Sequence, residues 1–329
     1  MALLRLVSGA WTAQAVHVAA RLGIADLLAD GPKAPDMLAA ATGAHGPTLG
    51  RLLRALASLG VFAEQPDGRF GLTPLAGGLR RDAEGSLRDY AVMMGDEWHW
   101  RAWGELLHSV QTGKTGFEKL HGEPIFDYLG KHPDEAAVFD QAMVAIHGRE
   151  TAAIIAAYDF SQFHEIIDLG GGNGSQLCEI LAATPEGKGV VFDLAHVIKR
   201  AKATIATAGL DSRCRTVGGS FFDSVPAGAD AYILRHIIHD WDDEKSLTIL
   251  RNIHRAMGPD GRLLLVEGVI PPGNEPCFGK LLDLTMLTIP GGKERTAEEY
   301  RTLLRAAGFD LTRIVPTQAE VSVIEGKKL

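Results

Sequence analysis

The hydrophobic and polar positions divide the chain into two parts with different periods. Up to about residue 155 the apolar positions recur every three or four residues, as in amphipathic helices. After Phe163, short apolar runs alternate with longer amphipathic stretches. This alternation is typical of a parallel sheet with helices on both faces, an α/β architecture. The runs that we expect to form strands are residues 165–169, 189–193, 215–218, 229–234 and 262–267.

The alternation of strands and helices ends near the C-terminus. Segments 309–315 and 320–324 both predict strands, and the stretch between them is too short for a helix. We therefore expect a terminal antiparallel hairpin on an otherwise parallel sheet. Upstream, residues 242–257 predict a helix that Gly258 ends, while Thr296 and Glu299 have the spacing of a capping box that opens another helix.

The first 85 residues predict several helices followed by a short hairpin. Segment 61–73 has the pattern of two strands around an Asp67-Gly68 turn, so the whole region resembles a winged helix. We expect Thr48 to cap the helix before the hairpin. That helix carries one apolar stripe, which favours self-association: Leu49, Leu52, Leu53, Leu56 and Leu59.

The charge pattern argues against DNA as the partner of this winged helix. The helix that would enter the groove offers only Arg51 and Arg54 as basic residues. The chain has 33 Lys and Arg against 41 Asp and Glu, a formal net charge of −8. Because binding to the phosphate backbone needs clustered basic residues, we expect no nucleic acid partner and predict a homodimer through this region.

Length and composition add three further limits. The 329 residues suggest two domains, each large enough for its own core. No stretch approaches 18 unbroken apolar residues, and the N-terminus has helical spacing rather than the pattern of a signal peptide. We therefore expect a cytoplasmic protein with no membrane partner. The three cysteines have unrelated spacings and indicate neither a disulfide framework nor a zinc ribbon.

A helical connector is expected between the N-terminal domain, residues 1–85, and the sheet domain, residues 156–329. This connector, residues 86–155, is rich in large side chains such as Met93, Trp98 and Trp103. Such side chains usually form a core. Their concentration between two domains also suits the wall of a ligand pocket.

The first predicted strand leads into a glycine-rich loop. Asp168 is followed by Gly170, Gly172 and Gly174 directly before a helix, so the backbone there must pass close to another group. The dinucleotide fingerprint would need glycine at position 175, where Ser175 stands. No Lys follows the glycines, as it would in a nucleoside triphosphate loop. The pattern D-x-G-x-G-x-G is instead the one associated with S-adenosylmethionine.

Asp193 supports this interpretation of the loop. It ends the second predicted strand, 23 residues after Gly170, where a carboxylate can accept hydrogen bonds from both ribose hydroxyls. The alternative is that Asp193 is a solvated strand end and that the loop binds a free phosphate at the helix N-terminus.

Candidate reactive groups follow the fourth and fifth predicted strands. His239 and Asp240 follow the fourth strand, Glu267 ends the fifth, and Glu294 lies in a later glycine-containing loop. An imidazole on which two carboxylates converge makes a general base with orienting partners. The alternative is a divalent metal site, although two of its possible ligands, Asp242 and Asp243, also suit the first turn of a helix. That metal-site set is His236, His239, Asp240, Asp242 and Asp243.

Together these motifs resemble the S-adenosylmethionine-dependent O-methyltransferases that act on small aromatic metabolites. That class includes plant phenylpropanoid and flavonoid enzymes, acetylserotonin methyltransferase and bacterial tailoring enzymes. The resemblance covers nearly the whole chain and includes DLGGGNG, VVFDLAHVI, LRHIIHDWDDE, LLLVEGVI, DLTMLTIPGGKERT and AAGF. It implies a Rossmann-like catalytic domain, a winged-helix dimerisation domain, S-adenosylmethionine as cofactor with S-adenosylhomocysteine as product, and a small aromatic hydroxylated acceptor.

The resemblance also implies roles for individual residues. His239 is the expected catalytic base, with Glu267 and Glu294 flanking it. The expected cofactor-binding residues are Asp168, Gly170, Gly172, Asp193, Gly219, Ser220, Phe221, Arg235 and Trp241. The expected substrate-binding residues are Phe139, Met143, His147, Asp240 and Met286, and no metal is implied.

Three positions depart from the plant members of this class. Arg235 stands where those enzymes usually have Lys, and Ser220 and Phe221 stand where many have Asp and Met beside the adenine. The stretch 286–291 is one residue shorter than in the plant enzymes. The chain is therefore more similar to the bacterial members.

Two other functions fit the same fold. One is an enzyme that uses bound S-adenosylmethionine for hydroxylation, decarboxylation or pericyclic chemistry, which the intact candidate base at His239 disfavours. The other is a non-catalytic winged-helix ligand sensor, which the lack of a basic recognition helix disfavours.

Overall fold

The computed structural model describes residues 2–148 and 150–329. They form two compact units: residues 2–105 with 117–148, and residues 106–116 with 150–329. The segment predicted as a connector, residues 86–155, is thus divided between the two units. Among the described residues, no helix is both long enough and apolar enough to cross a membrane.

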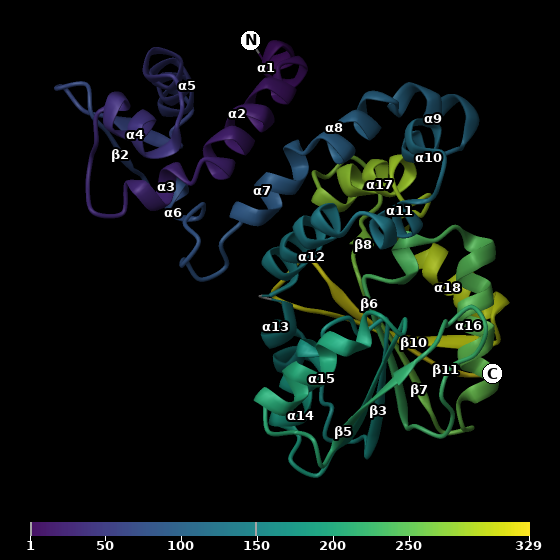
Figure 1. The fold of residues 1–329 in the computed structure, drawn as a ribbon. Coiled ribbons are helices and arrows are strands. Elements are labelled where there is room, and N and C mark those ends of the chain that lie inside the picture. The colour runs from purple at the N-terminus through teal and green to yellow at the C-terminus, as the bar shows by residue number, and fades with distance from the viewer. Residues whose placement is uncertain (1, 149) are drawn as a thin grey trace. The chain divides into compact units, whose positions relative to one another are not determined.

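The first unit consists of helices and one short hairpin (Figure 1). The predicted hairpin is confirmed, with β1 (Phe62–Glu64) antiparallel to β2 (Phe70–Leu72). Gly68 adopts a left-handed conformation in the turn, with φ of 79°. The helices of this unit are α1 (Ala2–Val7), α2 (Gly9–Arg21), α3 (Ile24–Leu27), α4 (Pro35–Thr42), α5 (Gly46–Ser58), α6 (Pro74–Gly77), α7 (Arg88–Gly95), α8 (Glu97–Gly104), α10 (Gly116–His121), α11 (Ile125–Lys131) and α12 (Pro133–His147).

The start of α5 differs from the sequence prediction. The helix begins at Gly46, with His45 at the N-cap position. Thr48 therefore lies inside the first turn and does not cap the helix. Its hydroxyl lies 2.8 Å from Nδ1 of His45. The reason is Pro47, which stands at the start of α5 and is well accommodated in a first turn.

Most of the leucine stripe of α5 lies in the core of the unit, so the prediction that the stripe self-associates was wrong for its buried members. Leu49, Leu53 and Leu56 are at most 3% exposed and belong to the unit's own core, together with Phe62 and Phe70 of the hairpin. Leu52 packs partly buried against the same core, whereas Leu59, at the end of the stripe, is 51% exposed. A larger group of exposed apolar side chains lies on α1 and α2: Leu3, Leu4, Leu6, Val7 and Trp11.

The second unit is built on a seven-stranded sheet with the order β10-β11-β7-β6-β3-β4-β5. The five predicted parallel strands are confirmed with ends shifted by at most two residues. They are β3 (Glu165–Leu169), β4 (Lys188–Asp193), β5 (Cys214–Gly218), β6 (Ala231–Arg235) and β7 (Arg262–Glu267). β6 begins two residues later than expected, and the Asp230 carboxylate just before it accepts hydrogen bonds from the amides of His164 and Glu165.

Helices cover both faces of this sheet (Figure 1). Ile166 and Ile167 are adjacent and fully buried, yet they belong to two different clusters, because successive side chains of a strand point to opposite faces. α16 and α18 pack on one face and α14 and α15 on the other. The helices of this unit are α9 (Leu106–Thr112), α13 (Glu150–Ala157), α14 (Ser175–Ala183), α15 (Ile198–Thr207), α16 (Asp243–Ala256), α17 (Phe278–Thr288) and α18 (Ala297–Ala306).

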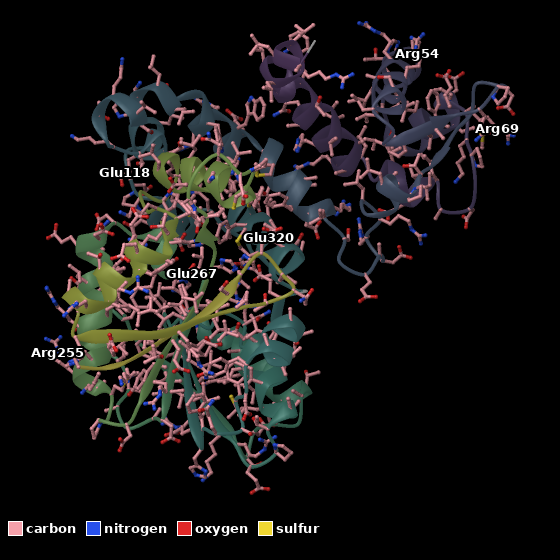
Figure 2. All side chains as sticks on the ribbon, turned by 180° about the vertical axis from the view of Figure 1, so that it is seen from behind. Arg54, Arg69, Glu118, Arg255, Glu267 and Glu320 are labelled. Carbon is pink, nitrogen blue, oxygen red and sulfur yellow. The ribbon has the colours of Figure 1, made fainter. Side chains whose placement is uncertain are left out.

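The C-terminal hairpin is confirmed by β10 (Phe309–Pro316) and β11 (Ser322–Lys328). β11 also pairs antiparallel with β7, in a register that sets Ser322 opposite Glu267. It is longer than predicted because it has a partner strand on each side. Figure 2 shows Glu267 among packed side chains of the second unit and Arg255 at its surface.

Candidate active site

The glycine loop lies between the end of β3 and the start of α14. Gly170 has φ of 70°, and a Cβ at this position would overlap the Ile237 side chain. Gly172 and Gly174 also have positive φ. Because other residues rarely adopt this conformation, the loop needs glycine for both its shape and its close packing.

Asp193, at the end of β4, holds this loop. Its Oδ2 accepts a hydrogen bond of 2.9 Å from the amide of Gly172, and its Oδ1 accepts one of 2.6 Å from the amide of Leu194. Burial raises the pKa of Asp193 although these two bonds oppose the shift. Each carboxylate oxygen has a second lone pair, so the group can still accept hydrogen bonds from a ligand.

Asp168 provides a test of whether the site fits the predicted cofactor. Its carboxylate is 2% exposed, and Oδ2 has no hydrogen-bond partner among the described residues. Burial raises its pKa to about 7, although the charge of Arg235 acts in the opposite direction. A buried acceptor beside the glycine loop fits a ligand that brings a cationic donor, as the ammonium of S-adenosylmethionine does.

Arg235 and the predicted adenine-side residues also lie at the carboxyl end of the sheet. Arg235 ends β6 and donates a 2.9 Å hydrogen bond to the hydroxyl of Thr151. Gly219 donates its amide to the carbonyl of Asp193 at 3.0 Å, and the hydroxyl of Ser220 accepts the amide of Phe222 at 3.2 Å. The predicted cofactor residues of β3 to β6 therefore lie on the loops where open α/β sheets bind ligands.

Two aromatic rings and a buried amide complete this side of the site. Phe221 lies edge-on to Trp241, with ring centroids 6.3 Å apart. The side-chain amide of Asn252 donates 2.8 Å hydrogen bonds to the carbonyls of Phe221 and Phe222. Sequence reasoning missed Asn252, because a polar residue in the middle of α16 gives no signal of a distant loop partner.

His239 lies on the 3-10 turn η1 (Ile238–Asp240) and is 7% exposed. Its Nδ1 is 2.7 Å from Oε1 of Glu294 and 3.7 Å from Oε2 of Glu267. A carboxylate oxygen only accepts, so Nδ1 carries a proton. The other ring nitrogen, Nε2, has Asp240 Oδ1 at 3.6 Å.

Glu267 is fully buried and also shapes the turn. Its Oε1 accepts hydrogen bonds from the amides of Ile237 at 3.1 Å and Ile238 at 2.8 Å. The adjacent oxygen faces His239. Glu294 is held through its main chain, because its amide donates a 2.8 Å hydrogen bond to Oδ1 of Asp283.

The carboxylates make His239 a stronger base than free histidine. Burial by itself would lower the pKa of the imidazole, but the charges of Glu267, Asp240 and Glu294 outweigh burial and raise it. Burial also raises the pKa of Glu267 to about 7 and that of Asp240 to about 6, although the charge of His239 opposes both shifts. His239, Glu267 and Asp240 therefore all bind protons at a higher pH than the same side chains would in isolation.

A second imidazole lies beside the first and was not assigned a role from the resemblance. His236 has its ring centroid 5.1 Å from that of His239, and its Nε2 lies 2.9 Å from Oε2 of Glu150. Burial, followed by the charges of His239 and Arg235, holds the pKa of His236 well below its usual value. Among the described residues, His236 is the one non-glycine residue with positive φ, at 52°. Sequence patterns give no sign of such a conformation.

The predicted metal-site alternative loses two of its residues to other roles. Asp242 caps α16 by accepting the amide of Lys245 at 2.8 Å, and Asp243 pairs with Arg295 at 2.8 Å. One group that could supply metal ligands is His236, His239 and Glu267, whose ligand atoms lie within 4.8 Å of one another.

The predicted substrate residues belong to different parts of the structure. Phe139, Met143 and His147 are half-buried at spacings of four residues along α12, in the first unit. Met286 is 8% exposed on α17, in the second unit, and its carbonyl accepts the amide of Gly291 at 2.8 Å. Asp240 lies beside His239. Their role in binding an acceptor stays a prediction.

Comparisons with known proteins identify the class of protein. Residues 103–310 match the O-methyltransferase domain, and residues 4–80 match the O-methyltransferase dimerisation domain. A phenazine O-methyltransferase of Lysobacter antibioticus is 50% identical over 327 residues, which cover 99% of this chain and 96% of that protein. Phenazine-1-carboxylate N-methyltransferase of Pseudomonas aeruginosa is 34% identical over 326 residues, covering 98% and 95%.

A solved structure adds the cofactor. An O-methyltransferase of neocarzinostatin biosynthesis, in complex with S-adenosylmethionine and 2-hydroxy-5-methyl naphthoic acid, superposes with a TM-score of 0.86 at 36% identity, covering 97% of this chain and 96% of that one. The chain belongs to the O-methyltransferase family. It is a methyltransferase, and its methyl donor is S-adenosylmethionine.

Proposed function

We propose that the protein methylates a hydroxyl group of a small polycyclic aromatic metabolite, with His239 as the general base. The observation that carries this proposal is the 2.7 Å pair between His239 Nδ1 and Glu294 Oε1. Because Nδ1 donates to Glu294, Nε2 is the nitrogen that can accept a proton from an acceptor hydroxyl.

When bound, S-adenosylmethionine supplies an electrophilic methyl group on a cationic sulfonium. The task of the protein is then to align the acceptor oxygen and to remove its proton. A phenol has a pKa of about 10, far above that of free histidine at about 6.5. By raising the pKa of His239 toward that of a phenol, the three carboxylates reduce the free-energy cost of the proton transfer.

Glu294 and Glu267 have distinct parts in this proposal. Glu294 fixes the tautomer of His239 and stabilises the imidazolium, as the carboxylate of a hydrolase triad does. Glu267 places the turn through its two backbone hydrogen bonds and adds negative charge on the Nδ1 side of the ring.

The choice of acceptor class rests on the relatives. The phenazine O-methyltransferase is half identical to this chain along nearly its whole length, so a hydroxyphenazine is the first acceptor to test. Hydroxynaphthoates are the second, because the related enzyme of neocarzinostatin biosynthesis has a naphthoic acid bound.

We also propose that the protein acts as a homodimer through α1 and α2. These helices lie in the segment that matches the dimerisation domain and expose a set of large apolar side chains, with Trp11 77% exposed. In the second unit, α9 and α17 contact each other and also expose apolar residues, namely Leu107, Val110, Phe278 and Leu281. A partner's N-terminal helices would cover such a surface.

A nitrogen acceptor is the second candidate, favoured by the related phenazine-1-carboxylate N-methyltransferase. The two candidates differ in their need for a base. A phenol must lose its proton, whereas an aromatic ring nitrogen attacks with a lone pair and has no proton to lose.

The test compares wild type with His239→Ala on 1-hydroxyphenazine and on phenazine-1-carboxylate, using labelled S-adenosylmethionine. We expect ether formation with the hydroxyphenazine to fall roughly 100- to 10,000-fold in the variant. Binding of S-adenosylmethionine, measured by calorimetry, should stay within a few-fold of wild type. An unchanged rate of ether formation would refute the base, and methylation confined to ring nitrogen would favour the second candidate.

A further inference from the structure

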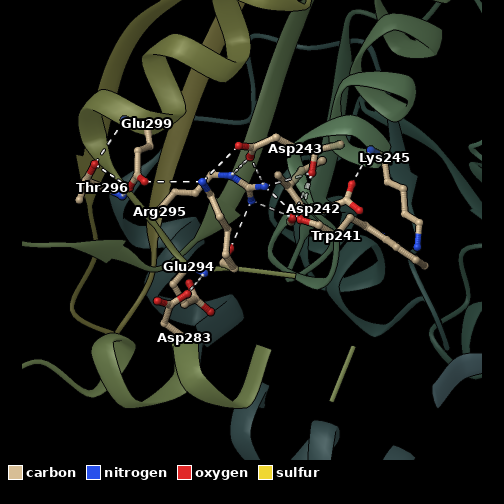
Figure 3. A network of polar contacts seen from close by, with 12 residues as sticks. Trp241, Asp242, Asp243, Lys245, Asp283, Glu294, Arg295, Thr296 and Glu299 are labelled. Atoms are coloured by element: carbon tan, nitrogen blue, oxygen red, sulfur yellow. Dashed lines mark hydrogen bonds and ion pairs between the residues drawn. The ribbon is translucent and has the colours of Figure 1, made fainter. Parts of the chain in front are cut away.

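Arg295 is the largest fully buried side chain among the described residues and follows Glu294 directly (Figure 3). A guanidinium stays charged at any physiological pH, so its burial is costly unless each N–H group has a partner. The partners of Arg295 therefore show what this side chain is built to hold.

The guanidinium binds the main chain on both sides of the proposed base. Nη1 donates a 3.0 Å hydrogen bond to the carbonyl of Ile238, and Nη2 donates one of 3.0 Å to the carbonyl of Trp241. These two carbonyls enclose His239 and Asp240 in the sequence. The remaining partners are Asp243 Oδ1 at 2.8 Å, the Lys293 carbonyl at 3.2 Å and Ser246 Oγ at 3.3 Å.

The strand that carries Arg295 is itself anchored beside Glu267. β9 (Arg295–Thr296) pairs in parallel with β8 (Val269–Ile270), with Arg295 opposite Val269. Val269 lies two residues after Glu267 in the chain. Arg295 thus connects the backbone of the His239 turn to the two paired strands, β8 and β9, that lie next to Glu267 and Glu294 in the chain.

Lys293 and Asp243 strengthen the same connection. The amide of Lys293 donates a 2.9 Å hydrogen bond to the carbonyl of His239, and its Nζ lies 3.1 Å from Asp243. Burial would raise the pKa of Asp243, but the hydrogen bonds from Arg295 and Lys293 hold it below its usual value. Asp243 therefore stays ionised as the counter-charge of the buried guanidinium.

We propose that Arg295 is a positioning residue for methyl transfer. Its guanidinium holds the turn in the position where His239 Nδ1 is hydrogen-bonded to Glu294 Oε1. In this way it maintains the tautomer and the raised basicity of the imidazole. The planar guanidinium binds the carbonyls of Ile238 and Trp241 through two separate nitrogens, Nη1 and Nη2, whereas an ammonium has a single nitrogen for both. The inference rests on the proposed role of His239 as the base.

The test is Arg295→Lys, which keeps the charge but loses the fork. We expect kcat for 1-hydroxyphenazine to fall about 10- to 100-fold, as for small misplacements of a reacting group, with the Kd of S-adenosylmethionine within about two-fold of wild type. Nitrogen-15 NMR of labelled histidine should show a lower pKa for His239 and a mixture of its two tautomers. The charged groups around the imidazole, Glu294, Glu267 and Asp240, are unchanged in this variant, as is His236.

Two further variants distinguish a loss of positioning from a general loss of the fold. Arg301→Lys is the matched control, since Arg301 is an exposed residue of α18 whose ion pair is with Glu298, and it should leave every readout unchanged. If Arg295→Lys does not fold, Asp243→Asn removes the counter-charge at a half-exposed position and should shift the His239 pKa in the same direction by a smaller amount.

The NMR readout separates this inference from the proposed function. If His239→Ala retains ether formation, the base assignment fails whatever Arg295 does. If Arg295→Lys is folded and its His239 keeps the wild-type pKa and a single tautomer, the positioning role is overturned even when activity is lost. The double variant with Glu294→Gln should be no slower than Glu294→Gln alone, because both changes act through one hydrogen bond.

Discussion

Gly292 lies directly against the backbone of His239, so closely that a Cβ on Gly292 would overlap the His239 carbonyl oxygen. The next residue, Lys293, donates its amide to that same oxygen. The turn with the proposed base and the loop with Glu294 are therefore packed main chain against main chain.

We expect Gly292→Ala to displace the turn and to lower kcat about 100-fold, because a shift of about 1 Å at a reacting group has this effect. Calorimetric binding of S-adenosylmethionine should change little. Gly258→Ala is the matched control, since a Cβ at that position meets open space and the turn is unaffected. Wild-type turnover in Gly292→Ala would show that the close approach is dispensable.

The pH dependence follows from the raised pKa of His239. The neutral imidazole is the base, and it forms as the pH rises through that pKa, so kcat/KM should increase with pH with a midpoint above 6.5, the ordinary value for histidine. Glu294→Gln removes one negative charge beside Glu267 and Asp240, lowers the pKa and should move the midpoint to lower pH while reducing the plateau. Steady-state kinetics over a pH series measures both. A midpoint that stays in place would mean that Glu294 does not tune the imidazole.

Asp193 should matter for cofactor binding more than for turnover. In Asp193→Asn the side chain loses its charge and one acceptor oxygen, so the hydrogen bond to Gly172 or the one to Leu194 is lost. The expected loss of S-adenosylmethionine affinity is about 1.5–3 kcal/mol, typical of hydrogen bonds to charged groups. Isothermal calorimetry gives the Kd, with the exposed Asp211→Asn as control. Equal affinities in the two variants would contradict the assignment.

The buried apolar residues of α5 and the exposed apolar residues of α1 and α2 should respond differently to truncation. Leu53 is fully buried, so Leu53→Ala should lower the free energy of unfolding by about 2–5 kcal/mol. Trp11 is 77% exposed, so Trp11→Ser should instead weaken the dimer, which sedimentation velocity at micromolar concentration detects as monomer. If Trp11→Ser stays fully dimeric while Leu53→Ala dissociates without unfolding, the interface lies elsewhere.

The sequence predicted those elements whose determinants are local. β3 was placed at its observed ends because an apolar run meets Asp168 and a glycine loop there, and the box of Thr296 and Glu299 was found because both of its hydrogen bonds lie within four residues. The α5 stripe was misjudged for the opposite reason. A periodic pattern shows that Leu53 lies on an apolar face but not that Phe62 and Phe70 cover that face.

The parts of the site that were missed depend on contacts between distant segments. The partners of Arg295 at Ile238 and Trp241 are carbonyl groups, which every residue has and no motif distinguishes. The pairing of His236 with Glu150 joins segments 86 positions apart. Both arrangements become visible only when the loops are in place.

The left-handed backbone of His236 limits how this enzyme can be re-engineered. Libraries aimed at new acceptors commonly randomise the residues around a base. At position 236, however, the backbone conformation restricts which residues are compatible with folding, whatever the acceptor. Glycine, asparagine and aspartate accept such a conformation, whereas valine, isoleucine and threonine would strain the turn that follows. A reduced codon set at position 236 would keep most members of such a library folded.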